Sequence, residues 1–150
     1  MPHFVTTTLV DWVDVFTRKS YRDVVVDCLD FCIREKAMVL YGYVIRSNHI
    51  QMVVQSGDGD LSGLLRDLKK FTATKIIEKI KSDPESRREW MLDSFQKSCE
   101  HLKKEQKHKV WQGGYHAEIV ESNWFIKQKV DYIHHNPVKD KIVTLPEGFI

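Results

Sequence analysis

Two polar side chains with lone pairs, those of His49 and Gln51, stand two positions apart in a stretch typical of a β-strand. Successive side chains of a strand point to opposite faces, so these two share one face while Ile50, Met52 and Val54 share the other. Two such groups on a rigid element could bind a divalent cation or a metal-bound phosphate. The same pattern also fits a half-solvated strand face that carries an ordinary histidine.

A tyrosine and an asparagine share one flank of the last predicted helix, residues 123–135. The apolar stripe of this helix, at helical spacing, consists of Ile126, Val130 and Ile133. Tyr132 lies off that stripe, and Asn136 is four residues further on, above it on the same face. The helix therefore presents a phenol and a carboxamide together, although a partly exposed tyrosine near a helix end is also common for structural reasons alone.

Basic side chains lie along a second helix, which the sequence predicts after Asp60 or Ser62. They are candidates for contacts to a phosphate backbone, or they form only a solvated face; they are Arg66, Lys69, Lys70 and Lys75. A further basic stretch occupies residues 103–109. Trp111 and Tyr115 are candidates for stacking on unpaired bases, although aromatic residues in such positions are more often part of a core.

Strands and helices alternate along the chain and would hold these groups in place. A central hairpin, Met38–Ile45 and His49–Val54, turns at residues 46–48; the other strands are predicted at 4–10, 109–112 and 115–120. Besides the last helix, helices are predicted at 20–36 with a capping box at Ser20–Asp23, from Asp60 or Ser62 to about 81, and from Asp83-Pro84 to about 102. We expect the connection 11–17, with Trp12, to pack against the body, and the tail 138–150 to run along the surface. This pattern predicts an α+β fold, with helices packed on a mainly antiparallel sheet.

The composition is that of one ordinary globular domain spanning residues 1–150. No apolar run is long enough to cross a bilayer and the N-terminus lacks a secretory signal, so we expect a cytoplasmic protein without a membrane partner. Cys28, Cys32 and Cys99 are expected to be buried free thiols. The net charge of +2 is small, so binding to a polyanion would depend on local clusters.

Two separate stretches resemble the single-tyrosine HUH transposases, in particular the REP-associated tyrosine transposases and other insertion-sequence-like members. These stretches are the hairpin Tyr43–Val54 (YVIRSNHIQMVV) and the helix end Val130–Val138 (VDYIHHNPV). The phrases WQGGYH at residues 111–116 and YIHHNPVK at residues 132–139 stand in the family's order and spacing. The resemblance covers nearly the whole chain, from about Phe4 to Val143.

The resemblance implies a ferredoxin-like fold and metal-dependent breaking and joining of single-stranded DNA, often next to a hairpin. It implies that Tyr132 is the nucleophile, leaving a 5′-phosphotyrosine, and that His49, Gln51 and Asn136 bind Mg²⁺ or Mn²⁺. The partner would be single-stranded or hairpin DNA. The insertion-sequence branch of the family implies a homodimer, and the sequence itself does not decide between monomer and dimer.

One departure from the family pattern concerns Gln51, which stands where the family has its second histidine. A glutamine oxygen can coordinate Mg²⁺ or Mn²⁺, so the site is altered without being obviously inactive. Three alternatives stay open at this point. They are a catalytically weakened or domesticated DNA-binding protein, a replication-initiator-like or relaxase-like nickase, and a metal-free structural protein with a fortuitous pattern.

Overall fold

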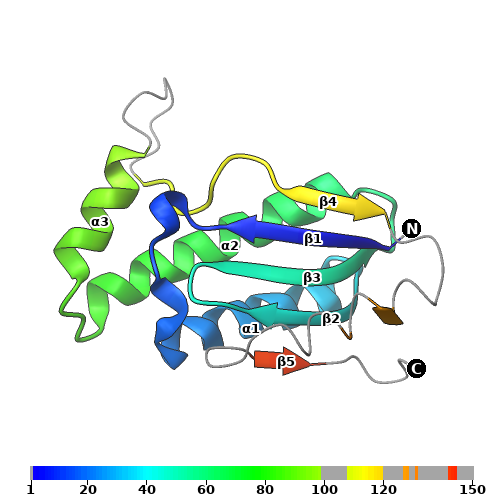
Figure 1. Ribbon diagram of the computed structural model, residues 1–150, viewed down its shortest axis with the longest axis horizontal. Helices are drawn as coiled ribbons and strands as arrows, with labels where there is room; N and C mark the ends of the chain where they lie inside the picture. Colours follow the sequence, from blue (N-terminus) through cyan, green and yellow to red (C-terminus); the bar gives the residue numbers. More distant parts are fainter. Residues whose placement is uncertain (1, 99–107, 120–126, 129–130, 132–141, 145–150) are drawn as a thin grey trace.

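The computed structural model describes residues 2–98, 108–119, 127–128, 131 and 142–144. Within these residues the chain forms an antiparallel sheet (Figure 1) of β1 (His3–Thr8), β2 (Met38–Ile45), β3 (His49–Ser56), β4 (His116–Ile119) and β5 (Ile142–Thr144). The described helices are α1 (Lys19–Glu35), α2 (Leu61–Ser82) and α3 (Arg88–Lys97). None of these helices combines the length and the apolar character needed to cross a membrane.

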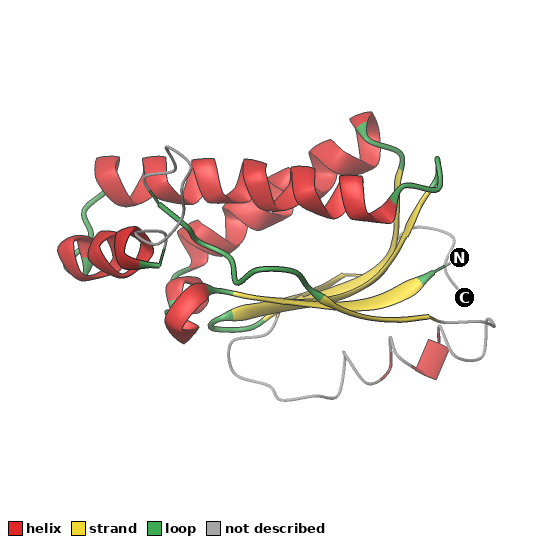
Figure 2. Cartoon of the chain, turned by 90° about the horizontal axis from the view of Figure 1, so that it is seen from above, coloured by secondary structure: helices red, strands yellow, loops and turns green. Residues whose placement is uncertain are grey.

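The strands lie in the order β4-β1-β3-β2-β5, and α1 and α2 cover one face of the sheet (Figure 2). The chain order β1-α1-β2-β3-α2-β4, with β4-β1-β3-β2 as neighbours, is the ferredoxin-like arrangement, which confirms the expected fold class. In the chain, α3 is inserted between α2 and β4. The strand β5 was not expected: part of the tail pairs antiparallel with Tyr43–Ile45 at the sheet edge.

The alternation along β3 divides its side chains between the two faces as predicted. The side chains that enter the core shared with α1 and α2 are those of Ile50, Met52 and Val54. His49 and Gln51 lie on the opposite face. That face is not fully open to solvent, because Val44 and Val53, which also lie on it, are completely buried.

The start of α2 was predicted correctly and the start of α1 was not. The carboxylate of Asp60 accepts a hydrogen bond from the N–H of Gly63 at 2.9 Å, which caps α2. The capping box predicted at Ser20–Asp23 is wrong. Since α1 already begins at Lys19, Ser20 lies inside its first turn, and Arg18 precedes the helix without a side-chain cap.

The third helix begins at Arg88, later than the predicted start at Asp83-Pro84. The residues before it form a turn in which Glu85 is buried. The carboxylate of Glu85 accepts a hydrogen bond from the N–H of Arg87 at 3.1 Å, so it holds the turn that precedes the helix. The earlier start was predicted because Asp83-Pro84 resembles a cap followed by a proline in the first helical turn. The buried Glu85 was not expected from the sequence.

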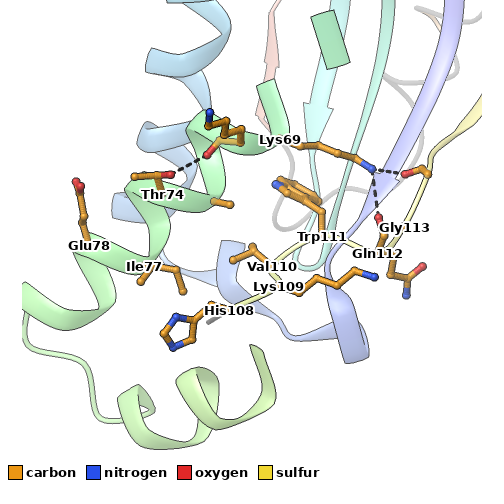
Figure 3. A pocket seen from close by; sticks show the side chains of 13 residues that line it. Lys69, Thr74, Ile77, Glu78, His108, Lys109, Val110, Trp111, Gln112 and Gly113 are labelled. Atoms are coloured by element: carbon orange, nitrogen blue, oxygen red, sulfur yellow. Dashed lines mark hydrogen bonds between the residues drawn. The ribbon is translucent and has the colours of Figure 1, made fainter. Parts of the chain in front are cut away.

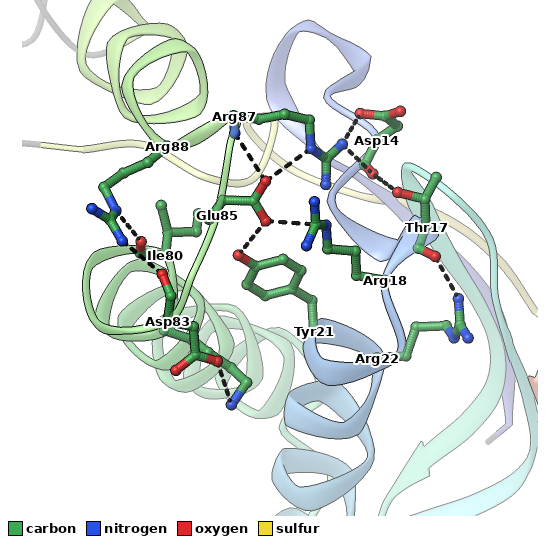
Figure 4. A network of polar contacts seen from close by, with 11 residues as sticks. Asp14, Thr17, Arg18, Tyr21, Arg22, Ile80, Asp83, Glu85, Arg87 and Arg88 are labelled. Carbon is green, nitrogen blue, oxygen red and sulfur yellow. Dashed lines mark hydrogen bonds and ion pairs between the residues drawn. The ribbon is translucent and has the colours of Figure 1, made fainter.

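Glu85 is the centre of a polar network that joins α1 to this turn (Figure 4). Its Oε2 accepts from the Tyr21 hydroxyl at 2.9 Å and lies 3.3 Å from Nε of Arg18. Its Oε1 lies 3.1 Å from Nε of Arg87, whose Nη1 donates to Asp14 at 2.7 Å. Burial alone would raise the pKa of Glu85, but the hydrogen bonds from Arg87 and Tyr21 outweigh it and lower that pKa.

The expected buried thiols are confirmed where the structure describes them. Cys28 and Cys32 are free and buried on α1. Burial raises the pKa of the Cys32 thiol to about 11, so it stays protonated at neutral pH. Cys99 lies outside the described residues.

The connection between β1 and α1 packs as expected at most of its apolar positions. Val13, Val15 and Phe16 are buried. Trp12 was expected to pack against the body as well, but its side chain is 68% exposed. This connection therefore buries Val13, Val15 and Phe16 and leaves its tryptophan in solvent.

Candidate functional site

The turn at residues 46–48 places His49 at the start of β3. It is closed by a hydrogen bond from the N–H of Arg46 to the carbonyl of His49, at 2.8 Å. From outside the hairpin, the N–H of Leu9 donates to the carbonyl of Asn48 at 2.9 Å. The backbone just before His49 is therefore held both by its own hairpin and by the end of β1.

The imidazole of His49 is oriented by its neighbour in the chain. Its Nδ1 lies 2.9 Å from Oδ1 of Asn48. When Nδ1 carries the proton and donates it to this oxygen, the lone pair of the ring is on Nε2, the atom that would bind a metal. Such a bond to the second ring nitrogen is the usual way in which proteins orient a metal-binding histidine. Sequence reasoning missed Asn48, although its place directly before His49 in a tight turn is a usable signal.

Gln51 has the feature expected of an oxygen ligand. Gln51 pairs across the sheet with Thr6 on one side and Val44 on the other, and only 9% of its surface is exposed. Its amide oxygen Oε1 is buried and accepts no hydrogen bond within the part of the chain that the structure describes. A buried carbonyl oxygen without a donor is unfavourable unless a cation or an unseen donor satisfies it. Together with His49 on the same face, it fits a hard divalent cation.

The two predicted site residues of the last helix, Tyr132 and Asn136, lie outside the described residues, so their roles stay predictions. Their described neighbour Asp131 has helical backbone. His49 and Gln51 point to the face of β3 opposite the core that the sheet shares with α1 and α2. Among the described residues, no group of three or more His, Cys, Asp or Glu side chains could hold a metal ion.

The structure separates the two aromatic candidates. Trp111 is buried, its indole N–H donates to the Thr72 hydroxyl at 2.9 Å, and its ring packs near Phe16. Trp111 is therefore a core residue, which corrects its prediction as a base-stacking residue. Tyr115 is exposed, and its hydroxyl lies 3.0 Å from that of Ser62.

The basic candidates of α2 also fall into two groups. The exposed side chains are Arg66, Lys70 and Lys75. Lys69 is partly buried, and its ammonium group donates to the carbonyls of Gln112 and Gly114 (Figure 3). Lys69 therefore holds the loop that precedes β4 against α2, and contacts of any of these four residues to DNA stay predictions.

A groove of about 580 Å³ lies between α2 and residues 108–114 (Figure 3). Lys69, Lys70 and Lys109 line it, together with Glu78. Burial, and next the positive charge of Lys109, lower the pKa of Lys69, so at least two of these cations repel each other. A phosphate group in the groove would relieve this repulsion, which makes the groove a candidate for contact with a nucleic-acid backbone.

Comparison with known proteins gives a match in structure and none in sequence. No protein-family model matches the chain, and no curated protein matches its sequence. A solved structure of a REP-associated tyrosine transposase bound to a REP hairpin superposes with a TM-score of 0.61 at 17% identity, covering 91% of this chain. The two share a fold. This chain matches 66% of the length of that transposase, just under two thirds.

Proposed function

We propose that this protein is a DNA transposase that cleaves and rejoins single-stranded DNA near hairpins, with Tyr132 as nucleophile and a divalent metal as cofactor. The observation that carries the proposal is the pairing of His49 and Gln51 on one face of β3, where Gln51 holds a buried oxygen without a donor among the described residues. The fold shared with a hairpin-bound transposase is the second support.

The proposed metal ligands are His49, Gln51 and Asn136, with Mg²⁺ or Mn²⁺ as the ion. When bound, the ion would polarise the scissile phosphate and neutralise the negative charge that develops during in-line displacement. The protein's own contribution is rigidity, since His49 and Gln51 project from one strand and Asn48 orients the imidazole. Fixed ligands reduce the reorganisation that accompanies the reaction.

Tyr132 would supply the covalent step. Its phenolic oxygen attacks the phosphorus, the bond from phosphorus to the 3′ oxygen breaks, and the leaving strand takes up a proton to give a 3′-OH. The other strand end stays attached as a 5′-phosphotyrosine. Because a free tyrosine has a pKa of about 10, the phenol has to lose its proton during the attack. The phosphotyrosine bond keeps the energy of the broken linkage, so attack by a 3′-OH can rejoin the strand.

The proposed partner is single-stranded or hairpin DNA. A homodimer, a cytoplasmic location and a single domain over residues 1–150 are predictions that the contacts of the described residues do not test. The groove between α2 and residues 108–114 would hold part of the DNA backbone, with Lys109 as one of its phosphate contacts.

A second candidate function is hairpin binding without cleavage. Gln51 favours this alternative, because a site that has lost one imidazole is expected to hold its metal more weakly. Such a protein would bind DNA hairpins equally well with and without a divalent metal.

Covalent adduct formation tests the proposal against this alternative. The wild-type protein, incubated with Mn²⁺ and single-stranded hairpin DNA taken from the sequence that flanks its gene, should form a protein–DNA adduct that survives denaturing electrophoresis. Tyr132→Phe should form none, because it has no hydroxyl to attack the phosphorus. If the wild type forms no adduct and binds hairpins equally well with and without Mn²⁺, the protein binds hairpins without cleaving them.

Lys109→Ala should weaken hairpin binding several-fold and equally for different DNA sequences, because it removes a phosphate contact and not a base contact. The slope of log affinity against log salt concentration should fall by about one. Fluorescence anisotropy at several salt concentrations would measure both. Lys19→Ala on α1 is the matched control, since it removes the same charge from a residue that pairs with Asp23. Equal losses in the two variants would mean that the groove has no special role.

A further inference from the structure

Trp12 combines an exposed aromatic ring with an unusual backbone conformation. Asp11 and Trp12 both have positive φ angles, 51° and 50°. This left-handed region is unfavourable for residues with a Cβ, and bulky aromatic residues are the least expected there. The side chain of Trp12 is 68% exposed, so the unfavourable backbone conformation does not serve to bury it.

The surrounding structure holds this turn in place. Val10 and Val13, on either side, are buried, and the N–H of Val10 donates to the carbonyl of Val110 at 2.9 Å. The carboxylate of Asp11 accepts a hydrogen bond from the hydroxyl of Ser94 on α3 at 2.8 Å. The two valines and the Asp11 contact fix the turn, and the ring of Trp12 is directed outward from it. Strain of this kind, held from several sides, is typical of functional positions.

The turn lies at the end of the sheet where the candidate metal site begins. Thr8, the last residue of β1, is the cross-strand partner of His49. Leu9 follows it and donates its N–H to the carbonyl of Asn48. Figure 1 shows the connection after β1 at the same end of the sheet as the turn between β2 and β3. Trp12 thus follows, three residues further along the chain, the residue whose N–H holds the carbonyl of Asn48, and it belongs to the same end of the sheet as His49.

We propose that Trp12 is a stacking platform for an unpaired base of the DNA strand that reaches the site at His49 and Gln51. The inference rests on the proposed function, because it takes its ligand from it. An indole ring stacks on any base, and it can do so only where the base is not covered by its neighbours in a duplex. Trp12 would therefore hold a single-stranded segment next to the scissile phosphate without reading its sequence.

Binding of two synthetic strands tests this role without requiring cleavage. Labelled oligothymidylate and an abasic strand of the same length carry the same phosphates and differ only in their bases. In buffer with EDTA, Trp12→Leu should bind oligothymidylate about five- to a hundredfold more weakly than wild type. Trp12→Tyr should stay within a few-fold of wild type, because it keeps an aromatic ring. On the abasic strand all three proteins should bind equally.

Trp12→Gly separates stacking from folding. Glycine adopts positive φ without strain, so this variant should unfold at or above the wild-type temperature while it binds oligothymidylate as weakly as Trp12→Leu. Wild-type affinity of Trp12→Leu for oligothymidylate would overturn the inference, and so would an equal loss on the abasic strand. The adduct experiment with Tyr132→Phe is separate: an adduct from wild type, with Trp12→Leu binding normally, would leave the transposase proposal standing and remove this one.

Discussion

Gln51→Leu is expected to slow metal-dependent adduct formation about a hundredfold or more, and to leave the metal-free protein at least as stable as wild type. The first effect follows because removing a residue that only hydrogen-bonds to a metal ligand already lowers metal affinity or activity about ten- to a hundredfold. Gln51 would be a ligand itself, so its loss should cost at least as much. The second follows because the amide oxygen that is lost has no donor among the described residues, and a buried group of this kind costs about 1 to 3 kcal/mol. Adduct rates with Mn²⁺ and urea unfolding in EDTA would measure the two effects.

Two further variants act on the same site from different directions. Gln51→His creates the pair of histidines found in the family that the sequence resembles, and should bind Mn²⁺ more tightly than wild type in a calorimetric titration. Asn48→Ala removes the oxygen that holds Nδ1 of His49, and should reduce metal affinity or the adduct rate about ten- to a hundredfold. Asn48→Asp keeps an acceptor at this position and should retain most of the activity.

The outcomes distinguish a ligand from a structural residue. If Gln51→Leu forms the adduct at the wild-type rate over the whole range of Mn²⁺ concentration, Gln51 is not a ligand. If the variant loses both activity and stability in EDTA, the amide stabilises the sheet and the orphaned oxygen has another explanation. A stable variant that no longer responds to Mn²⁺ is the result that the proposal requires.

The parts of the fold that the sequence predicted well are those set by local patterns. The alternation from His49 to Val54 gave both faces of β3, because one face has to join the core of α1 and α2. The turn at residues 46–48 and the cap at Asp60 are likewise determined by a few neighbouring residues. The pairing of His49 with Gln51 on one face follows from this alternation alone.

The parts that could not be predicted depend on contacts between distant segments. Trp111 is buried because its indole contacts Phe16 and Thr72, which are distant in the sequence. Trp12 is exposed because of an unusual backbone conformation that no sequence pattern predicts. A short strand such as β5 carries too few residues for a periodic signal, and only its partner β2 defines it. The lack of a donor for the amide oxygen of Gln51 also depends on its surroundings. The sequence therefore identified Gln51 as a candidate ligand, and the structure adds the physical argument for it.

Glu85→Gln is expected to destabilise the protein by about 2 to 3 kcal/mol, the largest loss of stability that we predict. The side chain of Glu85 is fully buried, and it faces Arg18, Arg87 and Tyr21. Glutamine keeps the shape but loses the charge, so the Tyr21 hydroxyl and the two guanidinium groups lose a charged acceptor; Arg18 remains 45% exposed and Arg87 keeps its contact with Asp14. Urea unfolding at neutral pH would measure the loss.

The same network predicts how stability changes with pH. The pKa of Glu85 is lowered from its ordinary value of 4.5, so the stability that the carboxylate contributes is present above that pH and is lost as the pH falls further. The pKa of Tyr21 is raised from 10.0 to about 12 by burial and by Glu85. The folded protein therefore holds the phenolic proton more tightly, and this contribution is lost as the pH rises from 10.0 towards 12.

Comparison with an exposed acid four residues away, in the helix that follows the turn, isolates the effect of burial. Glu89 lies in the first turn of α3 and is exposed, so Glu89→Gln removes the same charge and should change stability by no more than about 0.5 kcal/mol. A double-mutant cycle with Tyr21→Phe should show that the Glu85 and Tyr21 effects are not additive, because the two side chains share a hydrogen bond of 2.9 Å. In Glu85→Gln the loss of stability at acid pH should become shallower. An acid limb unchanged from wild type would mean that other carboxylates determine it, and that the buried charge of Glu85 is balanced elsewhere.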